Sequence, residues 1–303
     1  MPTLSRVDHR LAESRMALLQ ARRNQCGLLK ISCACVLAAV LSGCASAPLT
    51  TSGSLASYDG LTPAAGVVTQ SKLRVDKANV LAARTIAIVP TSYSSMASRA
   101  ELTDQQRHVI ANAVDRSVCI GLSDRFDVVP PGQAADLAVH VTITDVTVTN
   151  AAVAGASKVA SIVPAFLSGG ASHIIVPRIP LGMGSLSVEA EARDMRGQQK
   201  AAFVWARGAD MLTSTARVSA SGDAYDLAGE FGADFSKLMI TGENPFDNKL
   251  SMPSKQRVQS AFGGKPKYAA CDAFGRTGVT AFLGGKALGA APEWVDDAKP
   301  VAE

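Results

Sequence analysis

Between about residue 84 and residue 240, apolar positions follow strand and helix periods in turn. Arg84–Pro90 contains four consecutive apolar residues, which is typical of a strand buried on both faces. Thr103 followed by Gln106 forms a capping box, so we expect a helix to begin there. The positions that follow share one helical face, which should lie on the core: Ile110, Ala113, Val114, Ser117 and Val118.

Further strands follow this helix. Arg125–Pro131 has the pattern of a short strand that two prolines end. Leu137–Thr149 alternates apolar and polar residues as far as Asp145, where the phase reverses, and a β-bulge at that point would keep one face inward. Leu186–Met211 is typical of a hairpin whose turn places Gly197 where a positive φ is favoured.

The segment 151–183, between these strands, is small and apolar. We expect an inserted helical excursion, with Ala152, Ala156 and Ala160 on one face. That face could pack on the sheet, or it could contact a partner or lipid. On the return strand of the hairpin, Phe203 and Trp205 share one face, which favours core packing over a ligand platform.

A second helix closes the predicted domain. Its apolar residues form one stripe: Ala224, Leu227, Ala228, Phe231, Phe235, Leu238 and Met239. Residues 241–303 show no sustained period and are predicted to form an irregular C-terminal extension. The order of elements predicts an α+β fold, in which a mixed sheet of about five strands carries two main helices on one face.

The N-terminal region has a different pattern. Basic residues, among them Lys30, precede an apolar run from Ile31 to Leu41. This run is too short to span a bilayer, which needs about 20 apolar residues. Basic, apolar and then small residues are typical of a secretory signal peptide. Translation could begin at Met1 or at Met16.

The run ends in a lipobox: Leu41, Ser42, Gly43 and Cys44. This quartet resembles the export signals of bacterial lipoproteins. The resemblance implies cleavage between Gly43 and Cys44 and lipidation of Cys44. Ala45, where a retained lipoprotein has Asp, implies the outer membrane, facing the periplasm. The alternative is an ordinary signal peptide that ends at residues 45–47.

These boundaries divide the chain into four parts. Residues 1–43 are the predicted lipoprotein signal peptide, and residues 44–65, rich in Ala, Ser, Thr, Gly and Pro, are a predicted flexible tether. Residues 66–240 form the α+β domain, and residues 241–303 form the extension.

The net charge and the cysteines limit the possible partners and the compartment of the protein. The chain of 303 residues carries a net charge of +4. Residues 1–43 contain six basic and two acidic residues, so 24 of each remain after cleavage. A neutral body offers no basic field for nucleic acid. Of the six cysteines, only Cys119 and Cys271 lie beyond Cys44, and they could form one disulfide in an oxidising periplasm or remain as two thiols. Cys119 falls opposite the core stripe of its helix, where a returning C-terminal segment could reach it.

Residues 49–240 resemble DUF3313, a family of bacterial lipoproteins of unknown function. The segments that carry the resemblance are "SGSLASYDGLTP", "TIAIVP", "DLAVHVTITDVTVTN", the hairpin "LSVEAEARDMRGQQKAAF" and "DFSKLM". The resemblance implies a cell-envelope lipoprotein with no catalytic residues to carry over. The chain departs from the family pattern beyond about residue 240.

The sequence shows no spacing of an esterase elbow, a phosphate loop or a zinc-protease helix. His108, His140 and His173 are scattered over three predicted elements, which argues against a metal site. We therefore expect no cofactor and no enzymatic activity. The expected partners are the membrane, through the lipid, and an envelope protein, through residues 151–181. The alternative is a hydrolase or transferase of the envelope with an unrecognised site.

Overall fold

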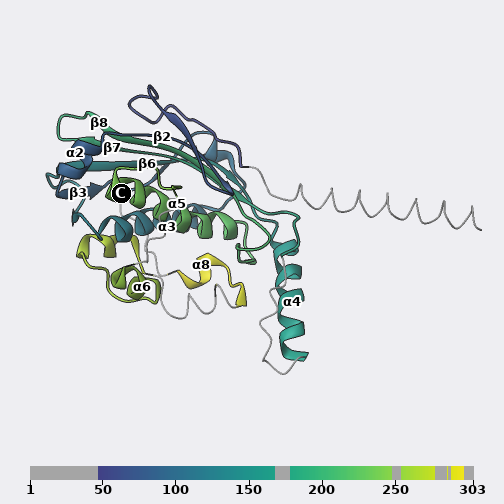
Figure 1. Ribbon diagram of the computed structural model, residues 1–303. Coiled ribbons are helices and arrows are strands. Elements are labelled where there is room, and N and C mark those ends of the chain that lie inside the picture. Colours follow the sequence, from purple (N-terminus) through teal and green to yellow (C-terminus); the bar gives the residue numbers. More distant parts are fainter. Residues whose placement is uncertain (1–46, 168–177, 248–253, 277–284, 286–287, 297–303) are drawn as a thin grey trace, which may run out of the picture. The chain divides into compact units, whose positions relative to one another are not determined.

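The computed structural model describes residues 47–167, 178–247, 254–276, 285 and 288–296 (Figure 1). The chain divides into two units, residues 1–43 and 44–303, and all described residues belong to the second. Its centre is one mixed sheet with the strand order β1-β2-β8-β7-β6-β3-β5, and β4 pairs with β6. The strands are β1 (Thr62–Ala65), β2 (Thr69–Val75), β3 (Thr85–Ile88), β4 (Ser92–Tyr93), β5 (Asp127–Val129), β6 (Leu137–Thr147), β7 (Ser185–Asp194) and β8 (Gln199–Gly208).

The predicted α+β class is confirmed, but the sheet has eight strands instead of about five. The five predicted strands are present as β3, β5, β6, β7 and β8. The additional strands lack an apolar run. In β2 the buried positions are Thr69, Ser71 and Leu73, so two of its three inward residues are polar. β2 becomes a strand because β8 offers it an antiparallel ladder.

Two local irregularities agree with the sequence pattern. The β6–β7 register shifts between Ile143 and Asp145, where the alternation reverses. Gly197 has a φ of 75° in the β7–β8 turn, a conformation that glycine adopts without the steric cost that other residues carry. The register shift leaves Ile143 and Val146 of β6 both buried, and the glycine turn lets β8 return beside β7.

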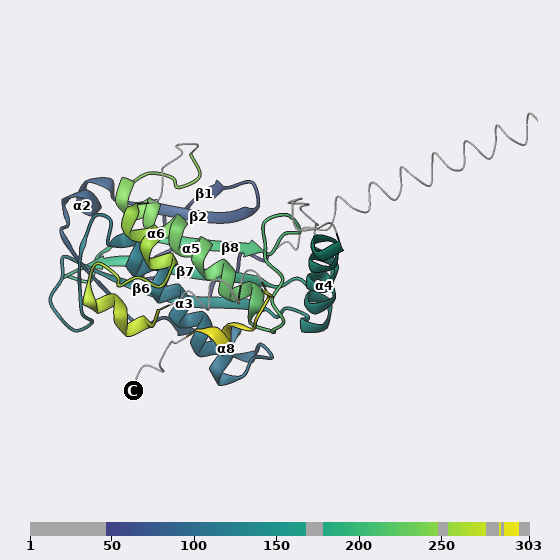
Figure 2. The ribbon, with the colours of Figure 1, turned by 90° about the horizontal axis from the view of Figure 1, so that it is seen from below.

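Two long helices, α3 (Asp104–Leu122) and α5 (Gly222–Thr241), cover that face (Figure 2). Thr103 and Gln106 form the predicted capping box at the start of α3. All seven predicted stripe residues of α5 are buried. At the end of α5, Gly242 adopts a φ of 63°, which is typical of a glycine C-cap.

An aromatic cluster joins α5 to the sheet. Phe203 and Trp205 of β8 are fully buried. The ring centroids of Trp205 and Phe231 lie 5.6 Å apart in an edge contact, and those of Phe231 and Phe235 lie 5.9 Å apart in a stacked one. The prediction that Phe203 and Trp205 are core residues is therefore confirmed.

The C-terminal region forms a third layer on the outer side of α3 (Figure 1). It contains α6 (Lys255–Ala261), η2 (Ala269–Phe274) and α8 (Pro292–Val295), joined by irregular segments. This layer covers the side of α3 that carries Cys119, which is buried against Cys271. Asn112 and Asp115, which the sequence also placed away from the core, are buried as well. The remaining short helices are α2 (Lys77–Ala82) and η1 (Ala97–Arg99).

The predicted excursion is present as helix α4 (Ala151–Leu167), which follows β6. The rest of the excursion up to residue 177 lies outside the described residues. Ala152 and Ala156 are exposed, whereas Ala154 and Ser157 are buried. The described positions of the predicted face, Ala152 and Ala156, therefore do not pack on the sheet, and the side chain of Ala160 lies outside the described residues.

The prediction of a flexible tether over residues 44–65 is wrong for its described part. Residues 62–65 form β1, and residues 47–61 lie on the sheet face opposite to α3 and α5. There Leu55 packs against Ala202 and Val204 of β8, with Leu49 and Leu61 at the margin. Composition predicted mobility, but these leucines and the polar residues beneath them fix the segment.

Candidate functional site

The N-terminal segment, residues 47–61, is held by a buried carboxylate. Glu189 on β7 is fully buried, and its Oε2 accepts hydrogen bonds from the backbone N–H and the hydroxyl of Ser52 and Ser54. Its Oε1 accepts from the Tyr58 hydroxyl at 2.6 Å. Burial, together with this hydrogen bond, raises the pKa of Tyr58 to about 12.

Glu191, two residues along the same strand face, extends this arrangement. Its carboxylate accepts from the Ala56 N–H at 2.8 Å and from the Gln199 amide at 2.6 Å, and it pairs with Arg193. Buried carboxylates require such partners, because an unpaired charge in the protein interior is costly. The N-terminal segment thus supplies partners that the two strand carboxylates need.

The segment is fixed from its first described residues onward. Ala47 is buried, and the Pro48 carbonyl accepts a 2.6 Å hydrogen bond from the Ser187 hydroxyl on β7. The predicted lipobox residues Leu41, Ser42, Gly43 and Cys44 lie outside the described residues. In sequence, Cys44 precedes Ala47 by three residues, so three virtual bonds of 3.8 Å bring it within about 11 Å of the folded body.

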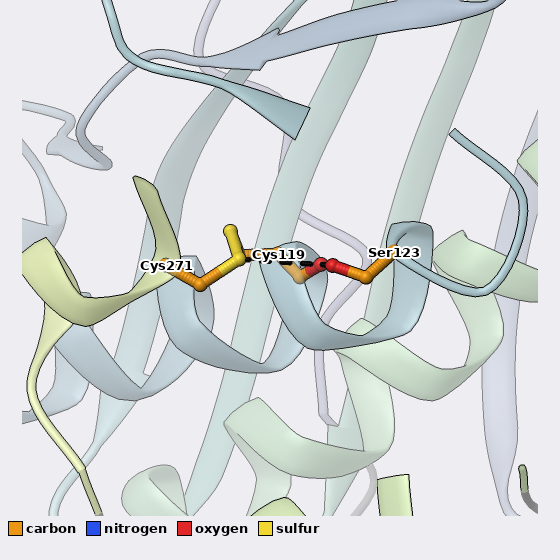
Figure 3. Close-up of a disulfide and its surroundings, with 3 residues drawn as sticks. All are labelled: Cys119, Ser123 and Cys271. Carbon is orange, nitrogen blue, oxygen red and sulfur yellow. Dashed lines mark hydrogen bonds between the residues drawn. A yellow bond between two sulfur atoms is a disulfide. The ribbon is translucent and has the colours of Figure 1, made fainter. Parts of the chain in front are cut away.

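The disulfide between Cys119 and Cys271 is present (Figure 3). Its Cα atoms lie 5.7 Å apart and its sequence separation is 152. Both cysteines are buried, and the Ser123 hydroxyl donates to the Cys119 carbonyl at 2.7 Å. The bond fixes η2 to α3 and so attaches the C-terminal layer to the domain.

A second attachment of that layer is ionic. Arg116 on α3 donates to both carboxylate oxygens of Asp296, at 3.1 and 2.7 Å, and to the Phe274 carbonyl. The Tyr225 hydroxyl on α5 also donates to Asp296. Nearby, Glu293 accepts from the hydroxyls of Ser219 and Ser221 just before α5. These buried and half-buried groups hold the C-terminal layer in place.

A third buried ion pair lies where β7 begins. Arg178 donates through two nitrogens to Asp223, the second residue of α5. The Gly184 N–H donates to the same carboxylate at 2.6 Å, and the Asp223 N–H donates to the Thr149 hydroxyl at 3.0 Å. The segment that returns from α4 is therefore joined to the start of α5.

Asp115 on α3 is a buried carboxyl group with a strongly raised pKa. Burial raises its pKa to about 7, against two hydrogen-bond contributions from Thr91 that lower it. The Thr91 N–H lies 3.0 and 3.1 Å from the two carboxylate oxygens. Only 1% of the residue is exposed, so Asp115 lies in the packing between α3 and β3 and not on a surface that substrate could reach.

The predicted histidines are not brought together. His108 is exposed on α3, whereas His140 is on β6, opposite Glu191, on the other face of the sheet. Burial and the charge of Arg193 lower the pKa of His140, and His173 lies outside the described residues. Within the part of the chain that the structure describes, no three His, Cys, Asp or Glu side chains could hold a metal ion. In the same residues, no helix has both the length and the apolar character needed to cross a membrane.

Sequence reasoning missed the carboxylates that hold the N-terminal segment. Glu189 and Glu191 alternate with Val188 and Ala190, which is the ordinary pattern of a strand with one solvated face. Nothing local indicates that this face is covered by residues more than 130 positions earlier. The run of serines and the single tyrosine between residues 52 and 58 is the only signal that could have suggested bonding partners.

Comparison with known proteins gives a family but no activity. The family model described as "Protein of unknown function (DUF3313)" matches residues 50–235. Curated proteins give no match to the chain. Among solved structures, the chain is similar to a PelC dodecamer from Paraburkholderia phytofirmans, with a TM-score of 0.33, 9% identity, and coverage of 57% of this chain and 97% of that one. A variant PelC dodecamer from the same organism gives a TM-score of 0.28, 10% identity, and coverage of 55% and 95%.

Proposed function

The chain belongs to the DUF3313 family of proteins of unknown function, and from this premise we propose that it is a lipoprotein of the bacterial cell envelope. Cleavage falls between Gly43 and Cys44, and lipid on Cys44 holds the protein on the outer membrane, facing the periplasm. The body has no catalytic role and binds or scaffolds another envelope component.

The observation that carries this proposal is where the folded body begins. The lipobox ends at Cys44, and Ala47 is already buried on the sheet. A signal peptide is removed from the mature protein, and cleavage before Cys44 leaves all the described residues of the domain in the product. The Cys119–Cys271 disulfide also suits an oxidising compartment such as the periplasm.

The intact mass of the protein purified from envelope membranes tests the anchor. We expect the mass of residues 44–303 plus a diacylglyceryl group and one further acyl chain. Cys44→Ser should remove these groups and release the protein from the membrane fraction. The matched control is Cys35→Ser, a cysteine within the apolar run, which should change neither mass nor attachment. A wild-type mass without acyl groups, or a Cys44→Ser protein that still sediments with membranes, would refute the proposal.

The binding role requires an exposed surface, and the described part of residues 151–181 provides one. Val159 and Leu181 are exposed large apolar residues. A photoreactive residue at Val159 should therefore form adducts with an envelope component in intact cells. The same residue at Met195, an even more exposed position in the β7–β8 turn, is the control. Equal labelling at the two positions would contradict a binding role for this segment.

A further inference from the structure

One end of the sheet collects several loops. Ser185, the first residue of β7, pairs with Thr147, the last residue of β6, and with Gly208, the last residue of β8. Three segments therefore start or finish here: helix α4, residues 178–184 and the loop after β8. We call this end of the sheet the α4 end; α4 lies beyond it in both views (Figures 1 and 2).

The loops at the α4 end expose large apolar side chains. The exposed fractions are 62% for Val159, 64% for Leu181, 67% for Leu212, 41% for Val218 and 70% for Leu288. We call these five residues the α4-end surface. Exposed large apolar side chains gathered at one end of a folded domain commonly mark an interaction site.

Hydrogen bonds join the segments that carry these residues. The Arg178 N–H donates to the Met211 carbonyl, and the Ile179 N–H donates to the Ser157 hydroxyl of α4. The Val218 N–H donates to the Gly289 carbonyl, next to Leu288. Four segments from distant parts of the sequence are thus fixed side by side.

The β1–β2 hairpin adds apolar residues at the same end. Thr69 pairs with Arg207, one residue before the end of β8. The turn just before Thr69 contains Val67 and Val68, both exposed. Exposed turns usually carry polar residues. Two exposed valines in this turn therefore indicate that it contacts an apolar environment.

The segments that carry the α4-end surface contain few charged residues. Residues 150–159, 178–182 and 211–218 contain no Asp or Glu. Their charged residues are Lys158, Arg178 and Arg217, all cations. Arg178 and Arg217 are buried and paired with Asp223 and Asp226 beneath the surface. These segments therefore place exposed apolar side chains, and no acidic side chain that anionic headgroups would repel, where the acyl-chain boundary of a bilayer could contact them.

The position of the predicted lipid anchor indicates that the α4-end surface contacts the bilayer. Pro48 is bonded to Ser187, two residues from Ser185 and therefore at the α4 end. Cys44 can extend no more than about 11 Å from Ala47. A lipid on Cys44 therefore enters the bilayer beside this end of the sheet, with at most about 11 Å of chain between the folded body and the anchored residue.

We infer that the α4-end surface docks on the phospholipid bilayer next to the acylated Cys44, so that the domain has one fixed orientation on the membrane. The inference rests on the proposed lipid anchor and names the envelope component that this surface contacts. Acyl chains provide the affinity, while the apolar side chains fix which end faces the lipid.

Fluorescence quenching tests the orientation. The acylated protein is prepared with Trp294→Phe, which removes the exposed native tryptophan and leaves the buried Trp205 as a constant background. A tryptophan is then added as Leu212→Trp or, at the opposite end of the sheet, as Met195→Trp. Both proteins are reconstituted in vesicles of phosphatidylethanolamine and phosphatidylglycerol, with or without brominated acyl chains.

We expect brominated lipid to quench the added emission of Leu212→Trp at least twofold more than that of Met195→Trp. Leu181→Trp should repeat this result at a second position of the surface. Equal quenching in a protein whose intact mass shows the acyl chains would overturn the docking surface and leave the anchor standing. A mass without acyl chains would overturn both.

A protein partner is the competing occupant. A photoreactive residue at Leu212 in intact cells should give lipid adducts. A discrete adduct with one protein, in place of lipid, would overturn the inference.

Discussion

Replacing Glu189 by Gln should release the N-terminal segment from the sheet. The carboxylate is fully buried and accepts from Ser52, Ser54 and Tyr58. A glutamine of the same shape has one acceptor oxygen and one donor nitrogen. Whichever way it is turned, the nitrogen faces hydroxyl or amide donors that now lack an acceptor.

The magnitude follows from these bonds. A hydrogen bond to a charged group contributes about 1.5–3 kcal/mol, and a buried donor without a partner costs about 1–3 kcal/mol. Because glutamine can keep some of the bonds, we expect the free energy of unfolding to fall by about 2–3 kcal/mol. In a domain of this size that lowers the Tm by roughly 4–12 °C.

Urea unfolding and hydrogen exchange measure the effect. The amides of Ser52, Ser54 and Ala56 donate to the two glutamates, so exchange over residues 47–61 should accelerate at least about tenfold. Ser54→Ala removes one donor and should cost about 1 kcal/mol. Ser57→Ala is the matched control, because its hydroxyl bonds only to the exposed Asp59. Wild-type stability and exchange in Glu189→Gln would refute the assignment of this carboxylate as the anchor of the segment.

Three further predictions concern the opposite face of the sheet. Replacing Cys119 and Cys271 by serine should lower the free energy of urea unfolding by about 5 kcal/mol in the chain-entropy model, and an unchanged midpoint would contradict the disulfide. Because the pKa of Asp115 is raised from 3.8 to about 7, its contribution to stability is largest below about pH 4 and is lost as the pH rises to about 7. The stability of Asp115→Asn relative to wild type should therefore increase over that window. Asp296→Asn leaves the Arg116 charge without its partner and should lower stability by about 3 kcal/mol, whereas an unchanged Tm would show that this pair does not hold the C-terminal layer.

The sequence by itself determined the elements in which apolar periodicity is strong. α5 buries every residue of its predicted stripe, and α3 begins at the predicted capping box. The reversal at Asp145 and the glycine turn at Gly197 are also confirmed. These features depend on side chains within one element or one turn, so local sequence is sufficient to specify them.

Only the tertiary structure decided how the less regular segments are used. Residues 47–61 have the composition of a linker, but two buried glutamates on β7 supply the acceptors that fix them. Cys119 lies on the polar side of its helix, yet the C-terminal layer buries it against Cys271. In each case the partner lies more than 130 residues away, so no local pattern contains the information. Burial of a charge or of a polar backbone group is unfavourable without a hydrogen-bond or ionic partner. The tertiary fold determines which of these segments lie close enough to such a partner to be buried.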